Sequence, residues 1–171
     1  MHRKSVTVVF AASMFISACS STALKPGPSS GIAAASNVGA PSLTDAQQSI
    51  NQSIRTLTAR SIFFDYDNYT LKPEYQDLLK DDSKLMTAAP SLFISVEGNA
   101  DERGSREYNL ALGQKRAVAV KKALLMLGVP EARMEAISYG EERPRATCAE
   151  EKCWSENRSA DIAAKQGAAR K

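Results

Sequence analysis

Four acidic side chains stand in two short segments of the sequence and could do chemistry. Asp65 and Asp67 follow an aromatic pair, and Asp101 and Glu102 lie between two glycines. Two carboxylates held apart could act as general acid and general base in the hydrolysis of a glycan. Other groups that catalysis commonly uses are missing. The one histidine, His2, lies in the segment that we expect to be removed as a signal, and the sequence has no phosphate-binding loop or nucleophile-elbow serine motif. The residues therefore give an enzyme little support.

A second set of candidate residues follows helical spacing. Asn109, Leu112 and Arg116 stand at i, i+3 and i+7, so one face of a helix carries all three, above the loop that holds Asp101. A guanidinium group binds carboxylates through paired hydrogen bonds. Helical spacing therefore puts the positive charge of Arg116 on the side of the helix above the loop that carries Asp101.

Each candidate could also have a purely structural role, and periodicity alone favours that structural role over a functional one. A turn would account for Asp65 and Asp67, and a solvated ion pair for Glu102 with Arg103. Tyr108 could be a core aromatic residue. Three apolar residues of the same helix are expected in the core: Leu110, Val118 and Leu124.

The first eighteen residues have the pattern of a secretion signal. A short basic start precedes an apolar stretch, Val6 to Ala18, which is too short to cross a bilayer core of ~30 Å as a helix. Residues 16–19, Ile-Ser-Ala-Cys, resemble the lipobox of bacterial lipoproteins, which implies that Cys19 carries lipid and begins the mature chain. Several acyl chains anchor a protein stably. The residue after the cysteine is Ser20 rather than Asp, which by resemblance to lipoprotein sorting signals implies export to the outer membrane. An ordinary secretion signal that ends by chance before a cysteine is the alternative.

The two remaining cysteines, Cys148 and Cys153, form an even pair in an exported chain, so we expect a disulfide between them. The alternative is half of a C-x4-C metal site. The mature chain, however, has no histidine and no second cysteine pair to complete tetrahedral coordination, so we expect no metal and no cofactor. A bridge that closes so short a loop would mainly stiffen the segment from Ala146 to Trp154.

Composition divides the chain into a tether and one domain. Residues 21–42 are rich in Ser, Ala, Gly and Pro and have almost no large apolar side chains, so they cannot offset the entropy of ordering. We assign 1–18 to the signal, 19–57 to the lipidated cysteine and flexible tether, and 58–171 to a single domain. Weak helical spacing marks 43–57. The net charge is +3, but the Lys and Arg residues form no continuous block, which argues against nucleic acid binding.

Alternating patterns predict the fold of the domain. Ser105 is a suitable N-cap for a helix that starts at residue 106, and Gly128 and Pro130 would terminate that helix. The order of elements predicts an α/β fold, a two-layer α/β sandwich of βαβαβ type with a mixed sheet of about four strands. Strands are expected at 61–64, 92–98, 134–139 and 160–163, and helices at 70–89 and 106–127.

An ordered series of motifs resembles one known family. The series comprises Phe63-Phe64-Asp65-Tyr66-Asp67, Leu71-Lys72-Pro73, residues 98–104 (GNADERG), residues 108–113 (YNLALG), Arg116-Ala117 and residues 138–144 (SYGEERP). Together these segments, spread over residues 60–163, resemble the OmpA-like domain superfamily and, within it, the family of peptidoglycan-associated lipoproteins. Asn99 departs from the pattern, because many members carry His there.

The resemblance implies non-covalent binding of peptidoglycan through the diaminopimelate of its stem peptides. The free end of that amino acid carries a carboxylate and an ammonium group, which Arg116 and Asp101 would bind, with Leu112 under the methylene groups. Amides at the start of the helix would add attraction for the carboxylate. The implied wall-binding residues are Phe64, Asp65, Asn99, Asp101, Glu102, Arg103, Tyr108, Asn109, Leu112 and Arg116.

Location and partners are implied by the same resemblance. The protein would be anchored by Cys19 to the periplasmic face of a Gram-negative outer membrane, within a Tol-Pal system that serves envelope integrity and cell division. The propeller protein TolB and other Tol or OmpA-like proteins are the implied partners. The alternatives are a module that only docks TolB and, with less support, a carboxylate-dependent hydrolase. We expect Asp101→Ala or Arg116→Ala to abolish wall binding while the fold stays intact.

Overall fold

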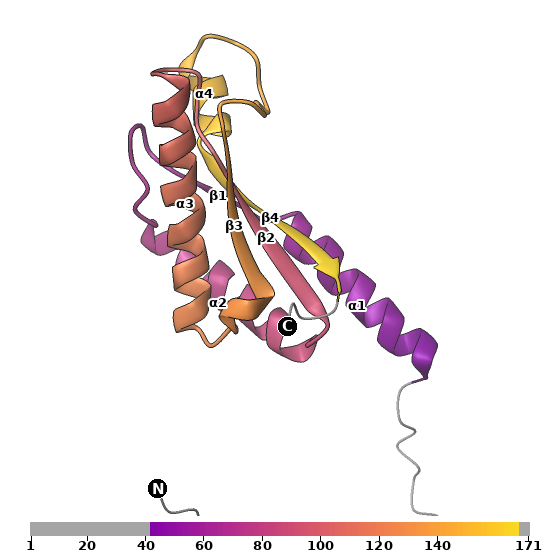
Figure 1. Ribbon diagram of the computed structural model, residues 1–171. Coiled ribbons are helices and arrows are strands. Elements are labelled where there is room, and N and C mark those ends of the chain that lie inside the picture. Colours follow the sequence, from indigo (N-terminus) through magenta and orange to yellow (C-terminus); the bar gives the residue numbers. More distant parts are fainter. Residues whose placement is uncertain (1–41, 168–171) are drawn as a thin grey trace, which may run out of the picture. The chain divides into compact units, whose positions relative to one another are not determined.

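The computed structural model describes residues 42–167, and the elements named below lie in that range. The strands are β1 (Ser61–Phe63), β2 (Leu92–Asn99), β3 (Met134–Gly140) and β4 (Ser159–Gln166). They form one open sheet in the order β1-β4-β2-β3 (Figure 1). β4 pairs antiparallel with β1 and with β2, whereas β2 and β3 are parallel. The predicted α/β class and mixed sheet are confirmed.

Helices cover the sheet to complete two layers. They are α1 (Leu43–Thr58), α2 (Gln76–Ala88), α3 (Arg106–Met126) and α4 (Glu151–Asn157), with 3-10 turns at Pro73–Tyr75 and Glu131–Arg133. α3 lies along β2 and β3, α1 contacts β4, and α2 contacts both α1 and α3 (Figure 1). α4 lies at the same end of the domain as the start of α3 (Figure 1).

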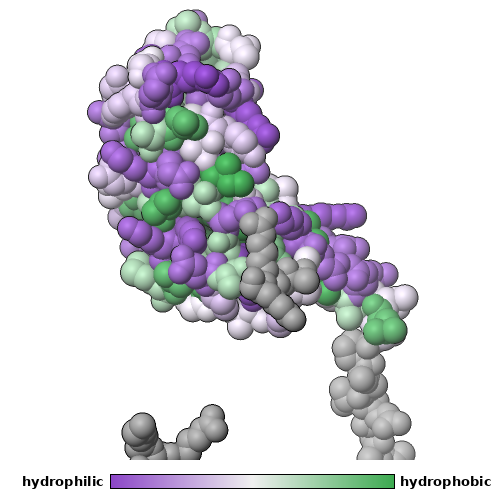
Figure 2. Space-filling model, in the orientation of Figure 1, coloured by the Kyte–Doolittle hydropathy of each residue, from purple (hydrophilic) through white to green (hydrophobic). Residues whose placement is uncertain are grey.

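The apolar core lies between the helices and the sheet. Every second residue of β2 enters it, because side chains alternate between the faces of a strand, and Leu92, Ile94 and Val96 are at most 1% exposed. Leu124 from α3 and Leu57 from α1 are fully buried. The surface seen in Figure 2 is mostly hydrophilic, with apolar side chains in small patches.

α1 corresponds to the weak helical spacing of residues 43–57 in the range predicted as tether. Ser42 and Asp45 form a reciprocal capping box at its start. Ile50 and Ile54 pack against the core that contains Leu57. Cys19, the signal and the rest of the predicted tether lie outside the described residues.

Two glycines bring the backbone of α3 against β2. A Cβ atom on Gly98 would lie 1.9 Å from the carbonyl oxygen of Gly113, and one on Gly113 would lie 2.7 Å from the carbonyl oxygen of Gly98. Neither contact is possible for a real side chain, so any larger residue would push helix and strand apart. This close approach places the face of α3 that carries Asn109 and Arg116 beside the end of β2.

Several predictions about the elements need correction, and one element was not predicted. The helix predicted at 70–89 starts only with the 3-10 turn at Pro73–Tyr75 and continues as α2 from Gln76. Leu110 is 50% exposed and is not a core residue, because the buried stripe of α3 runs through Asn109, Gly113 and Arg116, one position away. β4 continues to Gln166 beyond the predicted 160–163, since even its polar end pairs with β2. The helix α4 had no counterpart in the sequence analysis.

Candidate binding site

A polar hollow of about 160 Å³ opens beside the start of α3. The loop after β1, the loop after β2 and the N-terminal half of α3 form it. We call it the binding pocket, and its lining consists of Tyr66, Asp67, Ala100, Asp101, Arg103, Gly104, Tyr108, Asn109, Leu112 and Arg116. Six of the ten residues predicted as wall-binding therefore meet in one place: Asp101, Arg103, Tyr108, Asn109, Leu112 and Arg116.

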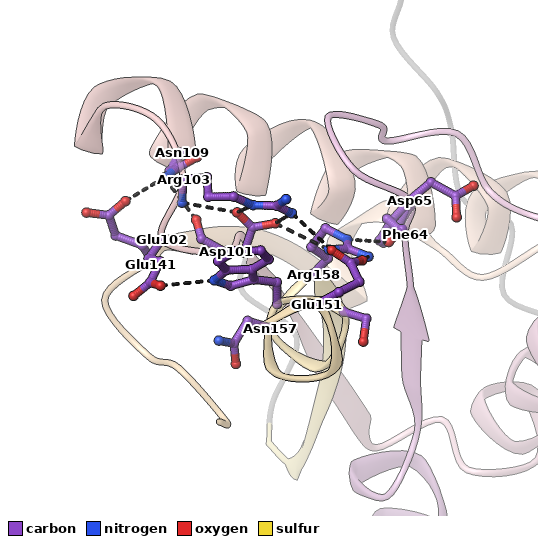
Figure 3. A network of polar contacts seen from close by, with 12 residues as sticks. Phe64, Asp65, Asp101, Glu102, Arg103, Asn109, Glu141, Glu151, Asn157 and Arg158 are labelled. Carbon is purple, nitrogen blue, oxygen red and sulfur yellow. Dashed lines mark hydrogen bonds and ion pairs between the residues drawn. The ribbon is translucent and has the colours of Figure 1, made fainter. Parts of the chain in front are cut away.

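Asp101 supplies the carboxylate of the binding pocket and is 4% exposed. Arg103 donates to it three times, from the backbone nitrogen at 3.1 Å, from Nε at 3.0 Å and from Nη2 at 2.7 Å, and Nη1 of Arg158 lies 3.4 Å away (Figure 3). Burial raises the pKa of Asp101, but the hydrogen bonds from Arg103 outweigh it and hold that pKa below the usual range. The carboxylate is therefore ionised at neutral pH.

Arg116 supplies the guanidinium group and is fully buried. It donates to the carbonyl oxygens of Asn68 at 2.8 Å, Asn99 at 2.8 Å and Asp65 at 3.1 Å. Burial lowers the pKa of Arg116 to about 10, although the charge of Asp101 opposes this shift, so the group is cationic at neutral pH. Arg116 thus connects both pocket loops to α3, so we expect Arg116→Ala to destabilise the fold as well.

The wall of the pocket on α3 carries Tyr108 and Asn109. Tyr108 is 49% exposed, so it is not a core residue, and its hydroxyl donates to the carboxylate of Asp67, which raises the pKa of the tyrosine. Asn109 is 1% exposed and donates to the carbonyl oxygen of Asp101 at 3.0 Å and to the carboxylate of Glu141 (Figure 3). These contacts hold the two loops against α3.

Four of the predicted site residues do not line the binding pocket. Phe64 is a core residue, and the carboxylate of Asp65 is largely exposed, 2.8 Å from Lys72. Asn99 is buried and donates to Ser159 and Asp161 of β4, as well as to the carbonyl oxygen of Glu97. The fourth, Glu102, is exposed and accepts a hydrogen bond from the indole of Trp154.

Sequence reasoning missed the residues that support Asp101 from behind. Arg158 is 5% exposed, donates to the carbonyl oxygen of Phe64 at 3.0 Å and forms ion pairs with Asp101 and Glu151 (Figure 3). Tyr66, Ala100 and Gly104 also line the pocket without having been predicted, and so does Asp67, which was considered only as a catalytic carboxylate or a turn residue. The sequence offered one indication of Arg158: the expected disulfide predicted a rigid segment from Ala146 to Trp154, just before this residue.

The predicted disulfide is present between Cys148 and Cys153, with the two Cα atoms 5.6 Å apart. It closes the turn that leads into α4. Within residues 42–167, no group of three or more His, Cys, Asp or Glu side chains is arranged to hold a metal ion. The helices in this range are also not long and apolar enough for any of them to cross a membrane.

Comparison with known proteins gives consistent similarities. A model described as the OmpA family matches residues 63–158. The peptidoglycan-associated lipoprotein of Brucella melitensis is 50% identical over 99 residues, which are 58% of this chain and 59% of that relative, so less than two thirds of its length is spanned. The one of Rhizobium meliloti is 37% identical over 158 residues, 92% of this chain and 86% of the relative.

Solved structures agree with these similarities. The crystal structure of the peptidoglycan-associated lipoprotein from Burkholderia pseudomallei has a TM-score of 0.64 and 45% identity, covering 68% of this chain and 99% of that one. The C-terminal domain of Helicobacter pylori MotB, with a TM-score of 0.59 and 21% identity over 64% of this chain and 86% of that one, shares the fold.

Fold and site together define an OmpA-like α/β domain with a polar pocket at one end of its sheet. The chain belongs to the OmpA family and, within it, to the peptidoglycan-associated lipoproteins.

Proposed function

We propose that the chain binds peptidoglycan non-covalently, through the diaminopimelate of stem peptides, in the pocket between Asp101 and Arg116. One observation carries the proposal: a buried carboxylate and a buried guanidinium group line the same small hollow. The family to which the chain belongs supports the choice of peptidoglycan as the ligand.

The pocket suits a zwitterionic ligand. Arg116 is fully buried and donates to three carbonyl oxygens, so its contribution to the pocket is a fixed positive charge that attracts a ligand carboxylate. The ionised Asp101 attracts an ammonium group, and Leu112 offers an apolar wall to the methylene groups between them. Charges interact more strongly in a partly dehydrated pocket than in water, so a ligand with only one of the two charges would bind less well.

The state of Asp101 supports binding rather than catalysis. A general acid in glycan hydrolysis needs a raised pKa, so that its proton is still present at neutral pH. The pKa of Asp101 is lowered instead, because Arg103 donates to both of its oxygens. A carboxylate held in this way is a poor proton donor. We therefore propose that Asp101 serves ligand binding and does not act as a general acid.

The proposed role of the whole chain is to link the outer membrane to the cell wall. Residues 1–18 would be removed as the signal, and lipid on Cys19 would anchor the chain to the periplasmic face of the membrane. The tether, 19–57, would end in α1, which packs on the domain through Ile50, Ile54 and Leu57. TolB and other Tol or OmpA-like proteins are the proposed protein partners, in a Tol-Pal system that serves envelope integrity and cell division.

Sedimentation with purified cell walls tests the proposed site. Asp101→Asn keeps the shape of the side chain but removes its charge, so we expect the variant to stay in the supernatant while wild type sediments. Asp77→Asn is the matched control, because Asp77 is exposed on α2 and lies outside the pocket lining. Circular dichroism checks that both variants are folded. Undiminished sedimentation of Asp101→Asn, or release of soluble wall fragments by wild type, would contradict the proposal.

A further inference from the structure

Arg103 is held in an aromatic clamp at the rim of the binding pocket. Its guanidinium carbon lies 4.2 Å from the ring centre of Tyr66 and 4.2 Å from that of Trp154. Arg103 also donates to both carboxylate oxygens of Asp101. Cation–π contacts and a bidentate ion pair fix the guanidinium group in one orientation. Arg103 therefore sets the charge and the position of the Asp101 carboxylate that faces the pocket.

One half of this clamp comes from α4, which lies outside the pocket lining. The indole nitrogen of Trp154 donates to Glu102 at 2.9 Å, which fixes the ring from the side of the loop. Glu151 lies 2.6 Å from Nη2 of Arg158 and 3.7 Å from Nη2 of Arg103 (Figure 3). α4 thus contacts both arginines that hold Asp101.

α4 depends on the surrounding chain for its position. It has only 7 residues, and its N-cap residue, Glu150, makes no side-chain capping hydrogen bond. A helix of this length is not stable by itself. The Cys148–Cys153 disulfide fixes its first turn, and Asn157 fixes its last turn through hydrogen bonds with the backbone of Arg145 and Ala146. The disulfide therefore holds the half of α4 that carries Glu151 and leads to Trp154.

We propose that the segment Cys148–Asn157 is a positioning element for the binding pocket and that tight binding of the ligand requires the disulfide. This inference rests on the proposed function. Without the bridge, the Trp154 ring no longer stacks reliably on Arg103, and the guanidinium group gains freedom that the ligand must remove on binding. Ordering one or two long side chains corresponds to about a tenfold loss of affinity.

The experiment measures the affinity of the full chain for a soluble stem peptide that contains diaminopimelate. We expect Cys148→Ser combined with Cys153→Ser to weaken binding about tenfold. Trp154→Ala leaves the bridge intact and should weaken binding to the same extent, whereas Trp154→Phe keeps a ring for Arg103 and should restore most of it. Tyr139→Ala is the matched control, because Tyr139 stacks with Arg143 at 3.4 Å outside the pocket lining.

Fluorescence separates positioning from a general structural role. Trp154 is the only tryptophan in the chain, so its emission reports on the clamp. We expect the emission of wild type to change when the stem peptide saturates the pocket, and the change to be lost in the double cysteine variant.

The outcomes distinguish the two proposals. Affinities of the double cysteine variant and of Trp154→Ala within twofold of wild type would overturn the inference and leave the proposed function standing. Equal weakening by Trp154→Phe and Trp154→Ala would also overturn it, because the stacked ring would then not matter. Absence of stem-peptide binding by wild type would overturn the proposed function itself.

Discussion

Arginines that are fully or partly buried connect the loops of this domain to its helices and strands. Arg116 donates to three carbonyl oxygens, and so does Arg133, whose acceptors belong to Met86, Ala89 and Leu92. A buried carbonyl group without a donor is costly, and a planar guanidinium group can serve several at once. The arginine with the proposed ligand role therefore has a structural role as well.

Replacement of Arg116 tests this double role. Arg116→Ala leaves three carbonyl oxygens without their donor, and we expect it to lower the free energy of unfolding by at least about 3 kcal/mol. Denaturation in urea gives the measurement. Arg106→Ala is the control, because the exposed Arg106 pairs with Glu142 at the surface, where an ion pair contributes little to stability. Equal stability of the two variants would show that the carbonyl contacts of Arg116 contribute little.

Among the elements, α2 carries a charge that the proposed function does not use. Asp82 is fully buried and faces Arg60, whose Nε lies 3.4 Å from its Oδ1. Within the described part of the chain, its carboxylate oxygens accept no hydrogen bond. Burial raises the pKa of Asp82 to about 6, and the charge of Arg60 only partly opposes this shift. Burial in the folded chain therefore favours the protonated form of the Asp82 carboxyl group more than the unfolded chain does.

The pH dependence of stability follows from this raised pKa. The unfolded chain ionises Asp82 near pH ~4 and the folded chain near pH 6, so stability is full below pH ~4 and is lost as pH rises through 6. Asp82→Asn removes this titration. We therefore expect the free energy of unfolding of wild type, relative to the variant, to fall by about 2 kcal/mol between pH 4 and pH 7.

Denaturation curves at several pH values measure this difference. Asp77→Asn is the control on the same helix, since the side chain of Asp77 is 90% exposed. Its difference from wild type should change far less with pH. A constant difference between wild type and Asp82→Asn would show that the carboxyl group titrates normally in the folded chain.

For the whole molecule, anchoring and wall binding are proposed to reside in different parts of the chain. Cys19 lies outside the described residues, whereas the binding pocket is formed by residues 66–116 of the domain. The helices in 42–167 give no candidate for a membrane span. The two activities should therefore separate cleanly when the anchor is removed.

Replacement of the lipid-bearing residue tests this separation. We expect Cys19→Ser to leave the membrane fraction, because several acyl chains account for stable attachment, and to keep sedimenting with purified walls. Membranes are fractionated after the wall has been digested, so that binding to the wall cannot retain the protein. Asp101→Asn should show the opposite behaviour, with membrane attachment kept and wall binding lost. Retention of Cys19→Ser in digested membranes would show that another part of the chain anchors it.

The sequence by itself determined the class of the fold and the location of the pocket. Local patterns were sufficient for α3, whose start at Ser105 and end before Gly128 are both marked by capping residues. Alternation of apolar residues identified β2 for the same reason, because side-chain periodicity is a local property. The ordered motifs, through the family resemblance, predicted six of the residues that line the binding pocket.

Only the tertiary structure decided which charges face each other. Arg103 and Arg158 hold Asp101, although Arg158 lies 57 positions away in the sequence. The position of α4 and the exposure of Leu110 were likewise decided by packing. The physical reason is that helix and strand patterns are set by neighbours in the chain, whereas ion pairs, stacking and burial depend on groups that meet only when distant segments pack.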